Sequence, residues 1–250
     1  MTPILPLLQR EQAAQFKSIT GASDKVAFDS LKAANWMLEA AIDYYFASGL
    51  SATTPGVDPK AVDQMFSAYK DPDEDVIGAE GIMKLCEDLG IEPADIVMLV
   101  IAFHMNAAAM GEFTKAEFSE GMLKMGVDSV DKLKKKLPEL REELNNPDRF
   151  HDIYNYAYMF SREKGQKCVH LETAVGMWQL LFSGNRWPLV NEWCDFLQKH
   201  HNRAISKDTW TQLYDFIKTI KPDFSNFEES SSAWPYLIDE FVEHSREKRT

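Results

Sequence analysis

The segment NWMLEAAIDYY, residues 35–45, shows the pattern that decides the fold of this chain. Its apolar residues Leu38, Ala41, Ile42 and Tyr45 are spaced at i, i+3, i+4 and i+7, which places them on one face of a helix. The same kind of spacing returns near the C-terminus, at Trp210, Leu213, Ile217 and Ile220. Alternating β-type runs with hairpin signals are not evident. The sequence therefore predicts an all-α protein.

Two helical regions are separated by a stretch of turn-forming residues. Residues 8–48 read as three short helices, of which the first covers residues 9–19, the second begins near Ser23 or Asp24, and the third follows Asn35, a good capping residue. Residues 49–59 are rich in Ser, Thr, Gly and Pro and are predicted to be a linker. Residues 60–245 read as a compact all-helical domain with short breaks, one of them expected at residues 136–138.

Charge and hydropathy exclude several classes of function. The 250 residues carry a formal net charge of −12, which disfavours binding to nucleic acids and anionic membranes and favours basic protein partners. The longest apolar run, residues 96–103, is far shorter than the roughly 20 residues of a membrane span. Residues 1–6 contain no basic region followed by an apolar core, and Gly is absent from position 2. We therefore expect a cytoplasmic or nuclear protein.

Calcium binding is the first chemistry to weigh, because two segments resemble halves of an EF-hand loop. Residues 71–75, DPDED, supply carboxylates at the first loop positions but are followed by Val76, Gly78 and Ile82 at positions 6, 8 and 12. The segment at residues 106–117 has Gly111, Phe113 and Glu117 at loop positions 6, 8 and 12, as an EF-hand requires. Its positions 1, 3 and 5 are Asn106, Ala108 and Met110, which supply no carboxylates. Ca²⁺ requires about six to eight oxygen ligands, so we expect EF-hand-like helix-loop-helix units without metal or cofactor.

Nucleophilic catalysis and zinc binding are also poorly supported. The chain has three widely spaced cysteines, Cys86, Cys168 and Cys194, without a C-x-x-C motif. Cys86 and Cys194 lie in apolar helical patterns typical of buried residues, while Cys168 lies in a polar stretch beside Lys167. His200 and His201 are adjacent and therefore cannot share one helix face as metal ligands. We expect a protein without a catalytic nucleophile.

A family resemblance appears in several short segments that occur in the same order along the chain. SKDTW (residues 206–210) and AWPYLIDEFV (residues 233–242) closely resemble the C-terminal part of the potentiating-neddylation (PONY/DCUN1) domain of the defective-in-cullin-neddylation (DCN-like) family. Residues 70–72, 147–150, 165–167 and 178–184 resemble other parts of the same domain. Residues 35–43 are similar to the third helix of a ubiquitin-associated (UBA) domain.

This resemblance implies a function as a scaffold-type co-E3 rather than an enzyme. Members of the family bind the C-terminal region of cullins and the N-acetylated conjugating enzyme of neddylation. They thereby bring the ubiquitin-like modifier close to the acceptor lysine, so that orientation and effective concentration accelerate the transfer.

Two sites are implied by the resemblance. The cullin-binding Asp, Ala and Asp of the family match Asp208, Ala233 and Asp239, whose two carboxylates can pair with Lys or Arg. The family pocket for the acetylated methionine matches a set of mostly apolar residues: Ala79, Ile82, Cys86, Met98, Ile101, Ala102, Met105, Phe113, Phe160 and Leu180. Acetylation removes the charge of the terminal amine and makes its burial feasible. The pocket departs from the vertebrate pattern at Ala79, Met98, Met105, Met110 and Gly111.

The UBA-like region departs from the ubiquitin-binding members of its family. Its loop, residues 19–23, lacks the aromatic residue that those members carry, so at most weak ubiquitin binding is expected. Two alternative functions stay open beside the scaffold: a non-catalytic ubiquitin receptor and an EF-hand-type calcium sensor. The sequence does not distinguish among cullins, and it leaves the peptide preference of the altered pocket open.

Overall fold

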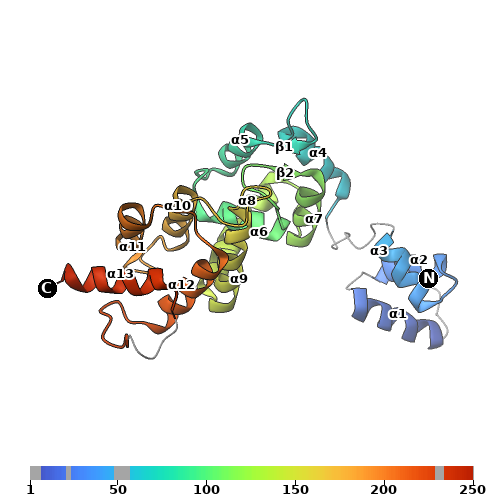
Figure 1. Ribbon diagram of the computed structural model, residues 1–250. Helices are drawn as coiled ribbons and strands as arrows, with labels where there is room; N and C mark the ends of the chain where they lie inside the picture. Colours follow the sequence, from blue (N-terminus) through green and yellow to red (C-terminus); the bar gives the residue numbers. More distant parts are fainter. Residues whose placement is uncertain (1–6, 21–23, 48–56, 229–233, 250) are drawn as a thin grey trace. The chain divides into compact units, whose positions relative to one another are not determined.

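The computed structural model describes residues 7–20, 24–47, 57–228 and 234–249 (Figure 1). Within these ranges the chain is almost entirely helical, which confirms the predicted all-α class. None of the described helices combines the length and the apolar character that a membrane crossing requires. The chain divides into two compact units, of which the first comprises residues 1–89 and 114–136 and the second residues 90–113 and 137–250.

Each unit is built from two separate stretches of the chain. The first unit contains α1 (Leu7–Thr20), α2 (Asp24–Ala33), α3 (Leu38–Ala47), α4 (Pro59–Tyr69), β1 (Val76–Ile77), α5 (Ala79–Leu89) and α7 (Lys115–Met125). The second contains α6 (Ile96–Met105), a 3-10 turn (Glu143–Asn145), α9 (Pro147–Phe160), α10 (Leu171–Leu181), α11 (Val190–Phe196), a π-helical turn (Leu197–His201), α12 (Lys207–Thr219) and α13 (Tyr236–Glu247). The boundaries between the units fall within β2 (Phe113–Thr114) and α8 (Val130–Glu142).

Helices α1, α2 and α3 pack against one another around a small apolar core, as predicted for a UBA-like unit. The core contains Phe16 from α1, Leu31 from α2, and Tyr45 from α3, and the rings of Phe16 and Tyr45 meet edge to face at 5.4 Å. The expected cap of the third helix is wrong. Asn35 has a left-handed backbone with φ of 51° and terminates α2, a conformation that asparagine tolerates better than most residues.

The two helix-loop-helix segments have the expected EF-hand-like form. Helix α4 leads through an acidic loop into β1 and α5, and α6 leads through a second loop into β2 and α7. The two short strands pair in a two-stranded sheet. Helices α4 and α5 approach closely at Gly81, where an added Cβ would lie 2.0 Å from the carbonyl oxygen of Tyr69. Only glycine fits this crossing, because any other residue would place its side chain on the backbone of α4.

A helix break expected at residues 136–138 is absent, and α8 continues through Pro138 to Glu142. Proline removes one helical hydrogen bond and usually bends or ends a helix. In α8 the ring of Pro138 is exposed, whereas Leu133, Leu137 and Leu140 are buried at helical spacing on the opposite side. We attribute the continuity of α8 to this apolar face, whose burial outweighs the loss of one exposed backbone hydrogen bond.

A buried aromatic cluster joins α9, α10 and α12 in the second unit. The indole rings of Trp178 and Trp210 stack with centroids 4.7 Å apart, and the ring of Tyr154 stacks on Trp210 at 5.0 Å. The Tyr154 hydroxyl donates to the Trp210 carbonyl oxygen at 2.8 Å and accepts from Trp178 Nε1 at 3.1 Å. All three side chains are completely buried. The cluster therefore satisfies its own polar atoms inside the core.

An ion pair holds the start of α6 against the end of α8 within the second unit. Asp95 caps α6 by accepting from the backbone nitrogen of Val97 at 3.0 Å. Its carboxylate also accepts two hydrogen bonds from the guanidinium of Arg141, at 2.7 Å and 2.5 Å. The hydrogen bond from Arg141 is the main reason that the pKa of Asp95 lies below its usual value.

We predict that Tyr154→Phe will destabilise the second unit, because it leaves the Trp178 indole N–H buried without an acceptor. The expected loss is about 1–3 kcal/mol of unfolding free energy, measured by urea denaturation. Tyr236→Phe, on an exposed position of α13 in the same unit, is the matched control and should change stability by less than about 0.5 kcal/mol. Equal stability of the two variants would contradict the role assigned to the Tyr154 hydroxyl.

We predict a pH-dependent effect for Arg141→Gln. Because the pKa of Asp95 is lowered in the folded state, the pair stabilises the fold above the unfolded pKa of Asp. That stability is lost as pH falls through the folded pKa. The variant should lose about 1 kcal/mol at pH 7 and progressively less below about pH 4, in urea titrations across this range. Lys199→Gln, from an exposed pair with Asp195 at 3.6 Å, should have little effect at any pH.

Candidate functional site

Asp208 lies in the first turn of α12, where its carboxylate is exposed. Ser206 caps the helix, and its hydroxyl accepts from the backbone nitrogen of Thr209 at 3.1 Å. The preceding residue, Ile205, is buried and forms an antiparallel bridge with Val169. The bridge and the cap together fix where α12 starts. Asp208 therefore has a defined position at a helix N-terminus, where a negative charge is favourable.

Asp239 lies in the first turn of α13 and is half-buried. Helix α13 is anchored by Phe241, whose ring meets Trp193 at 5.1 Å and Phe196 at 5.6 Å. Trp234, immediately before the helix, meets Phe216 of α12 edge to face at 5.7 Å. Asp208 and Asp239 thus lie on helices of the same unit that share an aromatic core. Ala233, the third predicted cullin-binding residue, lies outside the described residues.

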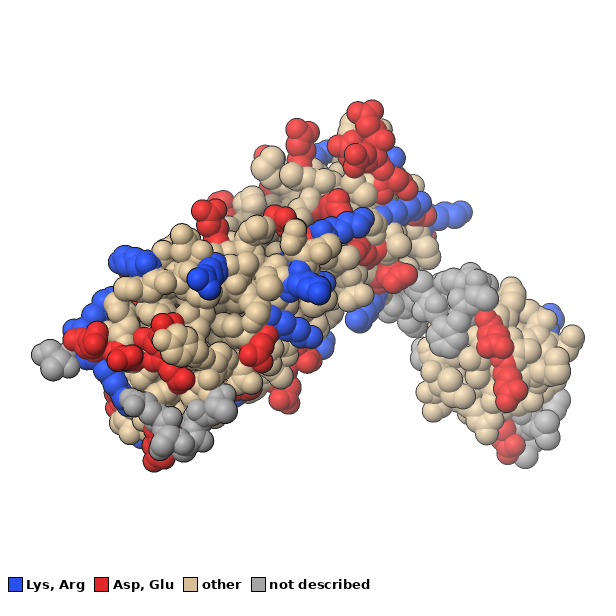
Figure 2. All heavy atoms as spheres, in the orientation of Figure 1, with Lys and Arg blue, Asp and Glu red and all other residues tan. Residues whose placement is uncertain are grey.

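The solvent-facing side of α13 is acidic. Besides Asp239 it carries Glu240, Glu243 and Glu247, and Figure 2 shows acidic side chains gathered over this helix. The same side carries Tyr236, whose side chain is 75% exposed. Sequence reasoning passed over Tyr236, although the apolar spacing of residues 237, 238, 241 and 242 already placed it opposite the buried face.

Residues of the predicted acetyl-methionine pocket come from both units, and each set is described separately. In the first unit, Ala79 is exposed, Ile82 is half-buried and Cys86 is buried, one turn apart along α5. In the second unit, α6 buries four of them: Met98, Ile101, Ala102 and Met105. Phe113 on β2 and Phe160 at the end of α9 are buried, and Leu180 on α10 is half-buried. All of these residues have the apolar character that such a pocket needs. That they together bind an acetylated methionine stays a prediction.

Leu180 borders a cavity of about 530 Å³ within the second unit. Apart from Ile96, its other lining residues are polar or small, and they lie near the start of α6, the end of α8 and α10: Ala94, Asp95, Ile96, Arg141, Gly176, Gln179 and Ser183. Gly176 has open space where a Cβ would lie. The cavity places the half-buried Leu180 within reach of a ligand, beside the Asp95–Arg141 ion pair.

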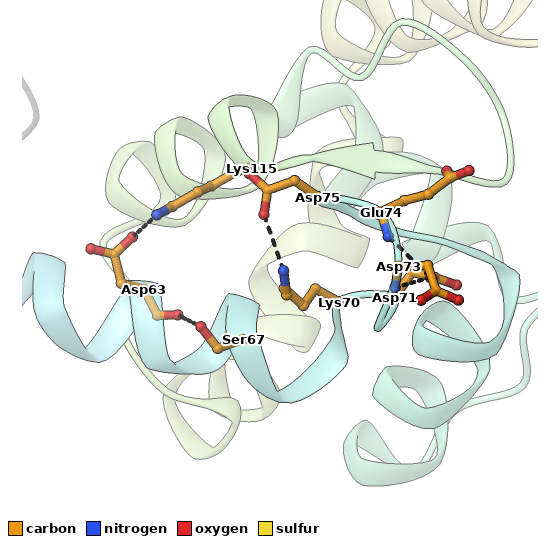
Figure 3. Close-up of polar contacts among 8 residues, drawn as sticks. All are labelled: Asp63, Ser67, Lys70, Asp71, Asp73, Glu74, Asp75 and Lys115. Carbon is orange, nitrogen blue, oxygen red and sulfur yellow. Dashed lines mark hydrogen bonds and ion pairs between the residues drawn. The ribbon is translucent and has the colours of Figure 1, made fainter.

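The acidic loop between α4 and β1 uses its carboxylates locally (Figure 3). The Asp71 Oδ1 atom accepts from the backbone nitrogens of Asp73 at 2.8 Å and Glu74 at 3.2 Å. Asp75 lies 3.4 Å from Lys70 Nζ, and on α4 the Asp63 carboxylate lies 3.2 Å from Lys115 Nζ. Among the residues that the structure describes, no group of three His, Cys, Asp or Glu side chains is arranged to hold a metal ion.

The second EF-hand-like loop has a structural use for its one well-placed acid. Glu117 accepts from the backbone nitrogen of Thr114 at 2.8 Å, and the Thr114 hydroxyl accepts from the backbone nitrogen of Glu117 at 3.3 Å. This reciprocal pair is a capping box that starts α7. Glu117 therefore stabilises a helix N-terminus, which accounts for its presence without a metal.

The cysteine and histidine candidates do not assemble into a reactive site within the described residues. Cys86 and Cys194 are buried, and burial raises the pKa of the Cys194 thiol to about 12. Cys168 is half-buried. The His200 ring stacks on Phe196 at 5.4 Å and meets His244 at 4.6 Å, and burial lowers the pKa of His201. His200 and His201 thus lie in the π-helical turn after α11, as helix-terminal residues.

The UBA-like unit exposes three large apolar side chains. Ile19 at the end of α1, Met37 before α3 and Tyr44 on α3 are each about half exposed. Of the loop predicted at residues 19–23, residues 19 and 20 belong to α1, and residues 21–23 lie outside the described residues. The weak ubiquitin binding expected from its sequence stays a prediction.

Comparisons with known proteins match both regions of the chain. A family model described as cullin binding matches residues 132–244, and one described as a UBA-like domain matches residues 10–51. DCN1-like protein 4 of Drosophila melanogaster is 42% identical over 186 residues, which cover 74% of both chains. DCN1-like protein 5 of Homo sapiens is 42% identical over 185 residues, covering 74% of this chain and 77% of the human one. DCN1-like protein 3 of Rattus norvegicus is 36% identical over 192 residues, covering 75% and 63%. The similarity confirms the resemblance seen in the sequence, and this chain belongs to the DCN1-like protein family.

Proposed function

We propose that this protein is a scaffold-type co-E3 that promotes transfer of the ubiquitin-like modifier of neddylation to a cullin lysine. The observation that carries the proposal is the match of residues 132–244 to the cullin-binding family. That range includes both Asp208 and Asp239. Each lies in the first turn of a helix whose position is fixed by a buried aromatic core. The chain has a cullin-binding domain and, as a DCN1-like protein, a role in cullin neddylation.

Cullin binding in this proposal depends on charge complementarity. The two aspartates pair with Lys or Arg side chains in the C-terminal region of the cullin. Opposite charges at the contact also increase the association rate, and the net charge of −12 adds to that attraction. Ala233, between them in the family pattern, provides a small side chain that permits close approach.

The second partner in the proposal is the neddylation conjugating enzyme with an acetylated N-terminus. The supporting observation is the apolar character of its predicted contact residues, several of which are buried. A bare ammonium group would be costly to bury among such side chains, whereas an acetylated amine carries no charge. Among these residues, Ala79 is exposed and Ile82 and Leu180 are half-buried, whereas the others are buried.

The rate gain comes from bringing two bound partners together. Holding the modifier-charged conjugating enzyme near the cullin lysine turns a bimolecular encounter into an intramolecular step. In this scheme the chain supplies no nucleophile, metal or cofactor of its own. The buried Cys194, whose raised pKa keeps the thiol protonated, is consistent with that assignment.

The UBA-like unit supports a second, weaker activity. Residues 10–51 match a UBA-like family model, and binding of ubiquitin would make the chain a non-catalytic ubiquitin receptor as well. We propose that any such binding is weak, because the loop at residues 19–23 has no aromatic residue. We further propose that the protein acts in the cytoplasm or the nucleus, where its three cysteines stay reduced.

We predict that Asp239→Arg will weaken binding to the cullin C-terminal region at least about 30-fold, because it places two like charges together. Asp208→Arg should act in the same direction. The measurement is calorimetry or biolayer interferometry with the full chain. Asp152→Arg, an exposed substitution on α9 with the same change of charge, should bind within about twofold of the parent. Unchanged affinity of Asp239→Arg would reject this contact.

We predict that the protein will accelerate reconstituted cullin neddylation with acetylated conjugating enzyme at least about tenfold more than with the unacetylated form. Leu180→Asp should remove most of this difference, because a carboxylate in an apolar contact resists desolvation. Gln198→Asp, at an exposed position of the π-helical turn after α11, controls for the added charge. Equal stimulation with both forms of the enzyme would reject the acetyl pocket, and absence of any stimulation would reject the scaffold function itself.

A further inference from the structure

The exposed side of α13 combines one aromatic side chain with carboxylates at helical spacing. Residues 236, 239, 240, 243 and 247 lie at i, i+3, i+4, i+7 and i+11, so they form a single stripe. Residues 237, 238, 241, 242 and 245 are buried on the opposite side. The stripe consists of Tyr236 and four acidic residues, and no Lys or Arg lies among these five positions. Tyr236 is the most exposed large apolar side chain of the described residues.

The orientation of Tyr236 is restrained by its own helix. Its hydroxyl is hydrogen-bonded to the Glu240 carboxylate one turn later, and the charge of Glu240 raises the pKa of the phenol. Pro235 precedes the residue and restricts the backbone at the start of α13. A tyrosine that is already oriented loses little conformational entropy on binding, which is one reason that tyrosine is frequent at interface hot spots.

Arg246 on α13 and Arg249 just after it contact residues 222–227 and do not belong to the acidic stripe. Arg246 donates to the carbonyl oxygens of Phe224 and Phe227, and its guanidinium lies 5.5 Å from the Phe227 ring centroid. Arg249, after the helix, donates to the Pro222 carbonyl oxygen and lies 4.8 Å from the Phe224 ring. The same unit therefore already contains arginines that combine an aromatic face with oxygen acceptors. A largely exposed aromatic ring beside carboxylates suits a cationic side chain from a partner.

The geometry points to Tyr236 as a specificity-determining contact for the cullin, receiving a Lys or Arg side chain of its C-terminal region between the aromatic ring and the carboxylates of Asp239 and Glu240. This inference rests on the proposed cullin binding and extends it by one residue. Asp239 and Glu240 lie three and four residues after Tyr236 on the same stripe, within the matched range 132–244. A basic side chain at this position gains both a cation–π contact and an ion pair.

The test compares Tyr236 variants of the full chain for binding to the cullin C-terminal region by calorimetry. Tyr236→Ala should weaken binding about 5- to 30-fold, as expected for removal of a tyrosine hot spot. Tyr236→Phe keeps the ring and should stay within about threefold of the parent, and Tyr236→Leu should lose nearly as much as alanine because it lacks the π face. Tyr44→Ala, an exposed tyrosine of the UBA-like unit, is the matched control and should bind like the parent.

Each outcome has a separate meaning. Thermal unfolding and circular dichroism of Tyr236→Ala should match the parent, because the side chain is exposed. If Tyr236→Ala binds the cullin within twofold of the parent while Asp239→Arg does not bind, the inference is wrong and the proposed function stands. If Tyr236→Ala instead weakens binding of only the conjugating enzyme or ubiquitin, the stripe has a different occupant and the inference is wrong. If the parent itself does not bind the cullin, both the inference and the proposed function are rejected.

Discussion

The stacked rings of Tyr154, Trp178 and Trp210 are the interaction on which the second unit depends. They connect three helices, α9, α10 and α12, at one completely buried point. The hydroxyl of Tyr154 and the indole of Trp178 satisfy each other there, so the cluster avoids the cost of buried polar atoms. Because Trp210 lies one turn after the start of α12, the same packing that forms the core also sets the position of Asp208. The position of the exposed Asp208 thus depends on the packing of the buried Trp210.

Carboxylates in this acidic chain have two different uses. Asp71, Asp95 and Glu117 cap turns and helices through hydrogen bonds to backbone nitrogens, and Asp95 also pairs with Arg141. These groups stabilise the fold locally, as carboxylates do near helix N-termini. On α13, Glu243 and Glu247 are instead exposed, on the same side of the helix as Tyr236. A high acidic content therefore does not by itself identify a binding surface, since only part of it faces outward.

The two EF-hand-like segments keep the helix-loop-helix fold, but the sequence of neither loop supplies a full set of calcium ligands. The helices and the paired strands are present, but Asp71 bonds its own loop and Glu117 caps α7. Asp71 and Glu117, each in a position that could have supplied a metal ligand, therefore have a structural role of their own. In the proposed function the EF-hand-like segments carry apolar contact residues on α5 and α6. Hydrogen bonds at turns and helix ends stabilise these segments without a bound ion.

The sequence by itself determined the helical class, the UBA-like region and the family, because helical spacing and short ordered motifs are local properties of the chain. It also predicted the buried spacing of Trp210 and Leu213, which the structure confirms. Tertiary structure decided the rest. Pro138 stays inside α8 because a buried leucine face outweighs one missing hydrogen bond, and Asn35 ends a helix rather than starting one because the backbone turns left-handed there. The apolar spacing of residues 237, 238, 241 and 242 already placed Tyr236 opposite the buried face, and the structure adds that its side chain stays 75% exposed because Ile238 and Phe241 pack into the core on the other side of α13.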